Sequence, residues 1–191
     1  MQAQRTSRQH VRRSALAIID MINTWQIADG AALLRQSARI VAPLARLKAR
    51  AQAAHVPVIY VNDNFGLWRS DFKQVIASAR GTSLRAAQIV NALAPGADDY
   101  FVLKPKHSAF FGTPLDLLLK ELHVARLIVC GVAGDQCVLA SASEALLRGY
   151  EVLIPSDAIA CRSAARTRAV LVHFREAMDI PTPPSRSVRL R

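Results

Sequence analysis

The chain has 191 residues, of which 51% are hydrophobic, and this length and composition are typical of one globular domain with a sizeable core. Its apolar runs are shorter than the roughly 18 residues that a membrane helix needs, and its three cysteines fit neither a disulfide framework nor a zinc site. We therefore expect a cytoplasmic protein with no membrane partner. The net charge of +11 is compatible with nucleic-acid binding, but lysine and arginine are scattered and recognition motifs are absent, so we expect a solvated basic surface and no nucleic-acid partner.

The chain divides into a tail, one domain and an extension. Residues 1–13 are basic, and the apolar run after them is short and ends at Asp20, which is typical of a first β-strand rather than of a signal peptide. Three prolines after Met178 break helical structure. We expect a basic N-terminal tail over residues 1–13, a single domain over 14–180 and a C-terminal extension over 181–191.

Strand-like apolar segments alternate with helical patterns along the chain. The strands are predicted over residues 15–20, 57–62, 99–104, 126–131 and 151–155. The helices are predicted at about 30–54, 84–93, 114–123, 136–148 and 163–177. This alternation is typical of parallel strands joined by crossover helices, so it predicts an α/β fold, a three-layer α/β/α sandwich around a mainly parallel sheet of five to six strands. Residues 187–190 are the candidate for the sixth strand.

Three chemically active side chains stand at the ends of predicted strands. Asp20 ends the first strand, Lys104 ends the third, and Cys137 follows the fourth after a short turn. Because the carboxyl ends of parallel strands open on one edge of a sheet, we expect these three side chains to converge. Each also has an ordinary explanation: a helix cap for Asp20, a solvated strand end for Lys104 and a small core residue for Cys137.

Cys137 occupies a position that suits a nucleophile. It opens a predicted helix, and the free N–H groups and positive dipole end at a helix N-terminus favour thiolate over thiol. The ammonium of Lys104 is expected to favour the thiolate further. The same N–H groups can bind an oxyanion.

Three segments, Asp20–Trp25, Lys104–Thr113 and Gly131–Val138, strongly resemble the isochorismatase-like cysteine hydrolases. That superfamily includes nicotinamidases, N-carbamoylsarcosine amidase, ureidoacrylate amidases and isochorismatases. The likeness runs in the right order from about residue 16 to residue 160. It implies the Rossmann-like fold of the superfamily, a cis peptide just before Ala133, a catalytic triad of Asp20, Lys104 and Cys137, and an oxyanion hole from the N–H groups of Ala133 and Cys137.

The chain departs from the superfamily pattern at three positions. Ile22 stands where many members have Gln, and Gly134 where many have Thr. Nicotinamidases bind a metal through an Asp-x-His element, of which this chain keeps Asp63 but has Phe65 in place of the histidine. We therefore expect no metal, no other cofactor and a substrate other than nicotinamide. His55, His107 and His123 lack metal-ligand spacing, so we interpret them as surface or supporting groups.

Four aromatic residues follow the predicted strand ends and are candidates for substrate binding, namely Trp25, Phe65, Trp68 and Phe110. An apolar, aromatic pocket is typical of small-molecule sites. The alternative for all four is the hydrophobic core, and Trp68 could instead cover a subunit interface. The resemblance implies a homo-oligomer, a dimer or tetramer, and the aromatic segment 64–72 gives that assembly modest support.

The retained cysteine decides between the chemistries of the superfamily. Its isochorismatases cleave a vinyl ether by acid catalysis from the Asp and often lack the cysteine. Cys137 therefore favours cleavage of a C–N, amide-type bond in a small molecule through an acyl-enzyme. Two alternatives stay open: a vinyl-ether hydrolase that uses Asp20 as its acid, and a non-catalytic small-molecule-binding protein on the same scaffold.

Overall fold

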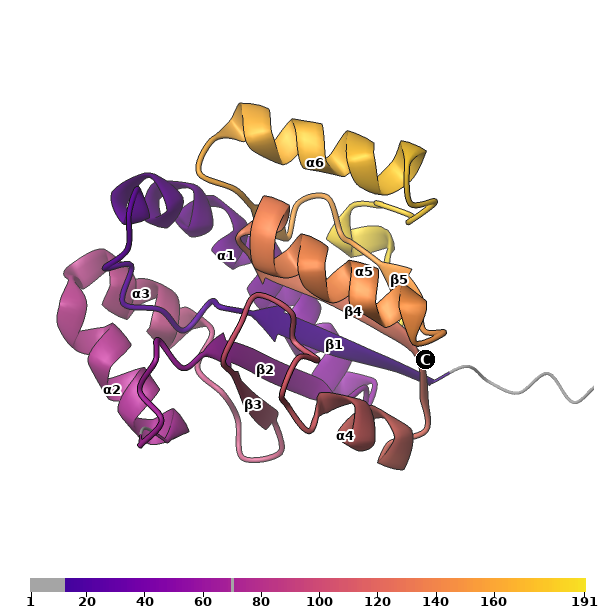
Figure 1. Cartoon of the computed structure of the whole chain (residues 1–191), viewed down its shortest axis with the longest axis horizontal. Helices are drawn as coiled ribbons and strands as arrows, with labels where there is room; N and C mark the ends of the chain where they lie inside the picture. The colour runs from indigo at the N-terminus through magenta and orange to yellow at the C-terminus, as the bar shows by residue number, and fades with distance from the viewer. Residues whose placement is uncertain (1–12, 70) are drawn as a thin grey trace, which may run out of the picture.

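The computed structural model describes residues 13–69 and 71–191. Its centre is a six-stranded sheet in which every paired strand is parallel (Figure 1). The strand order is β3-β2-β1-β4-β5, and β6 also pairs with β4. The strands are β1 (Arg13–Ile19), β2 (Val58–Asp63), β3 (Tyr100–Lys104), β4 (Val124–Val132), β5 (Glu151–Leu153) and β6 (Ile159–Ala160).

Helices cover both faces of the sheet, which confirms the predicted three-layer sandwich. They are α1 (Gly30–Ala53), α2 (Phe72–Thr82), α3 (Leu84–Ala92), α4 (Leu115–Glu121), α5 (Leu139–Leu147) and α6 (Ala164–Glu176). Two shorter turns complete the described elements, the π-helical η1 (Gly134–Val138) and the 3-10 turn η2 (Ser185–Ser187). Within this part of the chain, no helix is long and apolar enough to cross a membrane.

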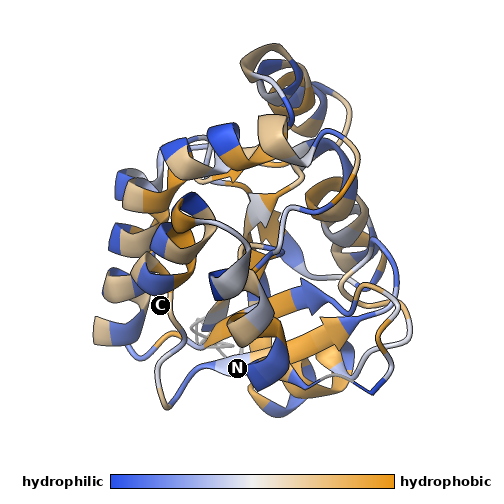
Figure 2. Cartoon of the chain, turned by 90° about the vertical axis from the view of Figure 1, so that its left-hand side faces the viewer, coloured by the Kyte–Doolittle hydropathy of each residue, from blue (hydrophilic) through white to orange (hydrophobic). Residues whose placement is uncertain are grey.

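The core consists of two hydrophobic layers, one on each face of the sheet. Neighbouring side chains of a strand point to opposite faces, so Leu16 and Ile18 of β1 pack with α1, α2 and α3, whereas Ala17 and Ile19 pack with α4, α5 and α6. Figure 2 shows the hydrophobic residues concentrated on the strands and on the helix faces turned toward them. This arrangement leaves the carboxyl ends of the strands as the edge on which polar side chains gather.

Helix α2 lies between the predicted strand at 57–62 and the predicted helix at 84–93, in a stretch for which the sequence analysis predicted no element. Its N-terminus is capped by Asp71, whose carboxylate accepts the N–H of Gln74 at 2.8 Å. Phe72 and Val75 are buried on its inner face, and Phe72 stacks on Phe101 of β3. The helix forms because this apolar face is buried against the sheet.

The sixth strand is β6, and the prediction of a strand over 187–190 was wrong. Ser187 is the last residue of η2, residues 188–190 follow it, and Val188 is buried. The guanidinium of Arg50 donates to the carbonyls of Ser185 and Val188 at 2.9 and 2.7 Å. The N–H of Ser14 in β1 also donates to the carbonyl of Arg191 at 2.7 Å, but residues 187–190 form no strand, and the arginine side chain holds them beside α1.

Candidate active site

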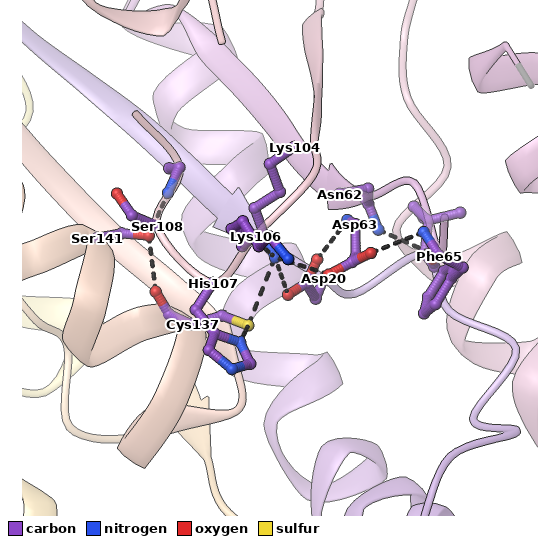
Figure 3. A network of polar contacts seen from close by, with 12 residues as sticks. Asp20, Asn62, Asp63, Phe65, Lys104, Lys106, His107, Ser108, Cys137 and Ser141 are labelled. Atoms are coloured by element: carbon purple, nitrogen blue, oxygen red, sulfur yellow. Dashed lines mark hydrogen bonds and ion pairs between the residues drawn. The ribbon is translucent and has the colours of Figure 1, made fainter. Parts of the chain in front are cut away.

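The three residues at strand ends meet at one point (Figure 3). Asp20 directly follows β1, Lys104 ends β3, and Cys137 lies in η1, between β4 and α5. The Nζ atom of Lys104 lies 3.0 Å from Oδ2 of Asp20 and 3.4 Å from Sγ of Cys137. The sheet thus brings together a carboxylate, an ammonium and a thiol from three parts of the sequence.

Lys104 is a buried cation surrounded by acceptors. Its side chain is fully buried, and besides Asp20 and Cys137 it contacts Oδ2 of Asp63 at 3.4 Å and the carbonyl of Lys106 at 3.2 Å. Burial by itself lowers the pKa of Lys104, but the Asp20 carboxylate and its hydrogen bond, together with the neighbouring Cys137 and Asp63, outweigh burial, so the pKa of Lys104 is raised. Lys104 therefore stays protonated at neutral pH.

Asp20 is a buried carboxylate with a raised pKa. Burial is the main cause, and it exceeds the opposing effects of the Lys104 ammonium, of hydrogen bonds with Cys137 and Lys104, and of the Asp63 backbone N–H. That N–H donates to Oδ1 of Asp20 at 2.7 Å, while Oδ2 contacts Lys104, so both carboxylate oxygens have partners. A carboxylate with a raised pKa is a better proton acceptor than one at the surface.

The surroundings of Cys137 favour the thiol over the thiolate, which is opposite to the expectation from the helix N-terminus and Lys104. Burial and the neighbouring Asp20 carboxylate raise its pKa to about 12, and the attraction of Lys104 offsets only part of this effect. The proton of the thiol therefore has to leave during the reaction. Asp20 is the carboxylate whose charge acts on this thiol, which makes it the candidate acceptor of that proton.

The turn before Cys137 has the backbone form that the resemblance implies. The peptide between Val132 and Ala133 is cis. The carbonyl of Ala133 accepts the N–H groups of Gln136 and Val138 at 3.0 and 3.1 Å, which winds the chain into η1. The assignment of the Ala133 and Cys137 N–H groups to an oxyanion hole stays a prediction.

Two glycines permit this turn. A Cβ atom at Gly131 would lie 2.1 Å from the carbonyl oxygen of Ile19, so only glycine allows β4 to lie this close to β1. A Cβ atom at Gly134 would lie 2.9 Å from Sγ of Cys161. The buried Cys161 thus fills the space that the threonine of many superfamily members would need at position 134.

A cavity of about 340 Å³ opens beside the sulfur. Asp20, Asp63 and Cys137 contribute to its wall, together with the aromatic side chains of Phe65 and His107. Its remaining wall combines small and apolar residues with polar groups, namely Asn23, Ile27, Ala28, Leu33, Val132, Ala133, Gln136 and Arg162. The cavity has the size and mixed lining of a site for a small molecule.

Arg162 is a member of the cavity wall that the sequence analysis missed. Its Nε atom is buried and has no hydrogen-bond partner, and its ion pair with the exposed Asp29 is long, at 3.7 Å. Arg162 follows β6, a strand of two residues. So short a strand leaves no hydrophobic pattern in the sequence, so nothing in the sequence placed Arg162 at the same edge as Cys137.

The structure brings one of the four predicted aromatic residues to the cavity. Phe65 lines it, whereas Trp25 is buried in the hydrophobic core and Phe110 is buried in the other core layer, where it stacks on Tyr150. Trp68 is 79% exposed and lies outside the cavity wall of its own chain. Its position is compatible with an interface rather than with a pocket in the isolated chain.

Asp63, the residue that the resemblance links to a metal, contacts the Lys104 ammonium in this chain. Its Oδ1 atom accepts the N–H of Phe65 at 2.6 Å, so both carboxylate oxygens have partners. In the described ranges 13–69 and 71–191, no three histidine, cysteine or acidic side chains are grouped so that they could hold a metal ion.

Comparisons with known proteins agree with this geometry. The family model of the isochorismatase domain matches residues 14–182. The chain is 42% identical over 149 residues to the uncharacterized isochorismatase family protein YaaI of Bacillus subtilis, which covers 78% of this chain and 81% of that protein. It is 26% identical over 162 residues to the N-carbamoylsarcosine amidase of an Arthrobacter species, covering 78% of this chain and 60% of that relative, which is less than two thirds of the relative's length.

A solved structure supports the same assignment. The isochorismatase family protein of Desulfovibrio vulgaris has a TM-score of 0.75 to this chain at 27% identity, over 92% of this chain and 96% of that one. The match of the family model over most of the chain and the sequence identity to the Bacillus protein are independent of the geometry described above. The chain is therefore a member of the isochorismatase family of hydrolases.

Proposed function

We propose that this chain is a cysteine hydrolase that cleaves the C–N bond of a small amide-type substrate through a thioester on Cys137. The observation that carries the proposal is the contact of the buried Lys104 ammonium with both the Cys137 sulfur and the Asp20 carboxylate. A nucleophile, its base and a cation in contact beside a cavity are the groups that covalent catalysis requires. The amidase among the relatives supports the same chemistry.

In the proposed mechanism, the proton of the Cys137 thiol passes to Asp20 as the sulfur attacks the carbonyl carbon of the substrate. Lys104 stabilises the negative charge that develops on the sulfur. The N–H groups of Ala133 and Cys137 bind the oxyanion of the tetrahedral intermediate. When the intermediate collapses, Asp20 returns the proton to the departing nitrogen, and an amine or ammonia leaves. Water then hydrolyses the thioester and regenerates the thiol.

Arg162 supports a substrate with an anionic group. A guanidinium presents a planar array of donors that matches a carboxylate, and the buried Nε of Arg162, in the same cavity as Cys137, has no hydrogen-bond partner beyond its 3.7 Å ion pair with Asp29. Phe65 and the apolar side chains of Ile27 and Leu33 line the cavity as well. We therefore assign to this site a small amide that also carries a carboxylate.

Replacing Arg162 tests this assignment. We expect Arg162→Met to raise KM for a carboxylate-bearing amide by roughly 10- to 100-fold, because a hydrogen bond to a charged group contributes about 1.5–3 kcal/mol. The matched amide in which the carboxylate is replaced by a methyl group should be almost unaffected by the substitution. Steady-state kinetics with both substrates measure this difference. Equal losses for the two amides would contradict the assignment of an anionic group.

The substrate itself can be found by screening small amides, with and without a carboxylate, for release of ammonia or an amine. We expect the wild-type protein to hydrolyse amides that carry a carboxylate. Cys137→Ala should hydrolyse none of them. Turnover that persists in Cys137→Ala would favour an enzyme that does not use the thiol.

One observation favours a second candidate, the vinyl-ether hydrolase. Burial raises the pKa of Asp20, and a raised pKa suits a group that donates a proton to an ether oxygen. In that case Cys137 would have no part in the chemistry. The two candidates differ in their response to Cys137→Ala.

The proposal includes a homo-oligomer in which the segment around Trp68 contacts another subunit. Trp68 and the neighbouring Leu67 are both exposed, and such clusters of apolar side chains usually mark contact sites. We expect Trp68→Ala to weaken assembly and to lower activity together, with an unchanged unfolding temperature of the subunit. Light scattering and activity, measured on the same samples, test this. A wild-type monomer with full activity at micromolar concentration would contradict a shared site.

A further inference from the structure

The loop between β3 and α4 brings a histidine to the nucleophile. The Nδ1 atom of His107 lies 3.5 Å from Sγ of Cys137, and the imidazole lines the same cavity. Figure 3 shows the sulfur between this ring and the Lys104 ammonium. His107 is exposed, whereas Asp20 is buried, so the sulfur has one proton carrier inside the protein and one on the solvent side.

The position of His107 is fixed by contacts on both sides of it in the chain. Before it, the carbonyl of Lys106 accepts a hydrogen bond from Lys104 Nζ. After it, the hydroxyl of Ser108 donates to the carboxylate of Glu144, and the N–H of Ala109 donates to the hydroxyl of Ser141 at 2.9 Å.

The second of these anchors leads back to the nucleophile. The hydroxyl of Ser141, which receives the N–H of Ala109, donates in turn to the carbonyl of Cys137 at 2.6 Å. The loop is therefore tied to the turn and helix that carry Cys137. The imidazole is held at the sulfur by its backbone rather than by chance orientation of a surface side chain.

Hydrolysis of a thioester on Cys137 needs a base for the attacking water. Asp20 is bonded to the Asp63 N–H and to Lys104 on the buried side of the sulfur. A water molecule that reaches the thioester from solvent meets His107 first, because His107 is the exposed one of the two groups. Histidine is the side chain that most often acts as a general base.

We propose that His107 is a catalytic residue of the hydrolytic half-reaction, in which its Nδ1 takes a proton from the water that attacks the thioester and returns it to the departing sulfur. This proposal rests on the proposed function. In the step, one O–H bond of water breaks and its proton binds Nδ1. The C–O bond forms, the C–S bond breaks with its electron pair on sulfur, and the imidazolium protonates Sγ. The products are a carboxylic acid, the thiol of Cys137 and a neutral imidazole.

The ionisable groups that surround this step carry both signs of charge. Besides the thiol, two carboxylates and two cations lie in the cavity wall or in contact with the sulfur. They come from the end of β1, from β2, from β3 and from the segment after β6, and are Asp20, Asp63, Lys104 and Arg162. Lys106 belongs to the same loop as His107 and contacts the site through its carbonyl.

The experiment uses 4-nitrophenyl acetate, because its nitrophenolate leaves without a proton and the acetyl thioester then isolates the hydrolytic half. Wild-type protein should give a stoichiometric burst of nitrophenolate and then a slower steady rate. His107→Phe should keep the burst and lose roughly 100-fold in the steady rate, the contribution of a general base. Intact mass spectrometry should show the acetylated protein accumulating in this variant.

His107→Gln distinguishes a base from a mere spacer, since glutamine can hydrogen-bond but cannot take a proton at neutral pH. It should match His107→Phe, and recovery of the steady rate in His107→Gln would contradict the proposal. The matched control is His173→Phe, on the exposed side of α6, which should behave as wild type.

Two further results would overturn the proposal. If His107→Phe lowers burst and steady rate by the same factor, or changes neither, His107 has no specific part in thioester hydrolysis. If wild-type protein shows no acetylation of Cys137 at all, the proposed function itself is wrong and the role of His107 is lost with it. The Cys137→Ala variant, which should give no burst, separates these two failures.

Discussion

The variant Cys137→Ala is expected to lose amide hydrolysis by about 10,000-fold or more, because the proposed thioester cannot form without the sulfur. Its fold should change little, since the substitution removes one atom from a side chain at the wall of a cavity. Ammonia or amine release, followed by circular dichroism and thermal unfolding, measures both quantities. The same variant assayed on a vinyl ether separates the two candidate functions, because acid catalysis by Asp20 would survive the substitution.

The matched control is Cys130→Ala, which removes a buried thiol from β4 outside the cavity wall. It should keep its amidase activity and lose some stability, because it leaves a small void in the core. Amide turnover that survives in Cys137→Ala, or that disappears equally in Cys130→Ala, would contradict the thioester mechanism.

The variant Asp20→Asn is expected to separate the reactivity of the thiol from catalysis. In the wild type, burial and the Asp20 carboxylate raise the pKa of Cys137 to about 12. Removing the carboxylate lowers that pKa and increases the thiolate fraction at neutral pH, so alkylation of Cys137 by iodoacetamide should become roughly 10-fold faster or more. Amide hydrolysis should fall by roughly 100- to 10,000-fold, because the base that receives the thiol proton is gone.

Lys104→Met provides the opposite case. The ammonium lowers the pKa of Cys137, so its removal should raise this pKa further and make alkylation slower than in the wild type. In the wild type itself, the alkylation rate should rise about tenfold with each pH unit until the pH approaches about 12. Alkylation over a pH series, followed by peptide mapping, measures the rate at Cys137 in the wild type, in Asp20→Asn and in Lys104→Met. Rapid alkylation of wild-type Cys137 at neutral pH would show that the thiolate is already present in the resting protein.

The sequence alone determined the architecture and the three residues at the centre of the site. Buried parallel strands are continuous apolar runs, and amphipathic helices have a 3.6-residue period, so both leave local patterns. The end of each strand is visible in such a pattern. The rule that parallel strands open on one edge then places Asp20, Lys104 and Cys137 together without any coordinates. Their resemblance to a known superfamily added the cis peptide before Ala133.

Only the tertiary structure decided which other side chains lie near the Cys137 sulfur and how the pKa of Cys137 is shifted. Arg162 lies at the cavity because β6 pairs with β4, and a strand of two residues has no period to recognise. His107 meets Cys137 because Lys104, Ser141 and Glu144 hold its loop, and these contacts join residues far apart in the sequence. The raised pKa of Cys137 has the same origin, since it depends on burial and on the charges of Asp20 and Lys104, which stand at the ends of two different strands.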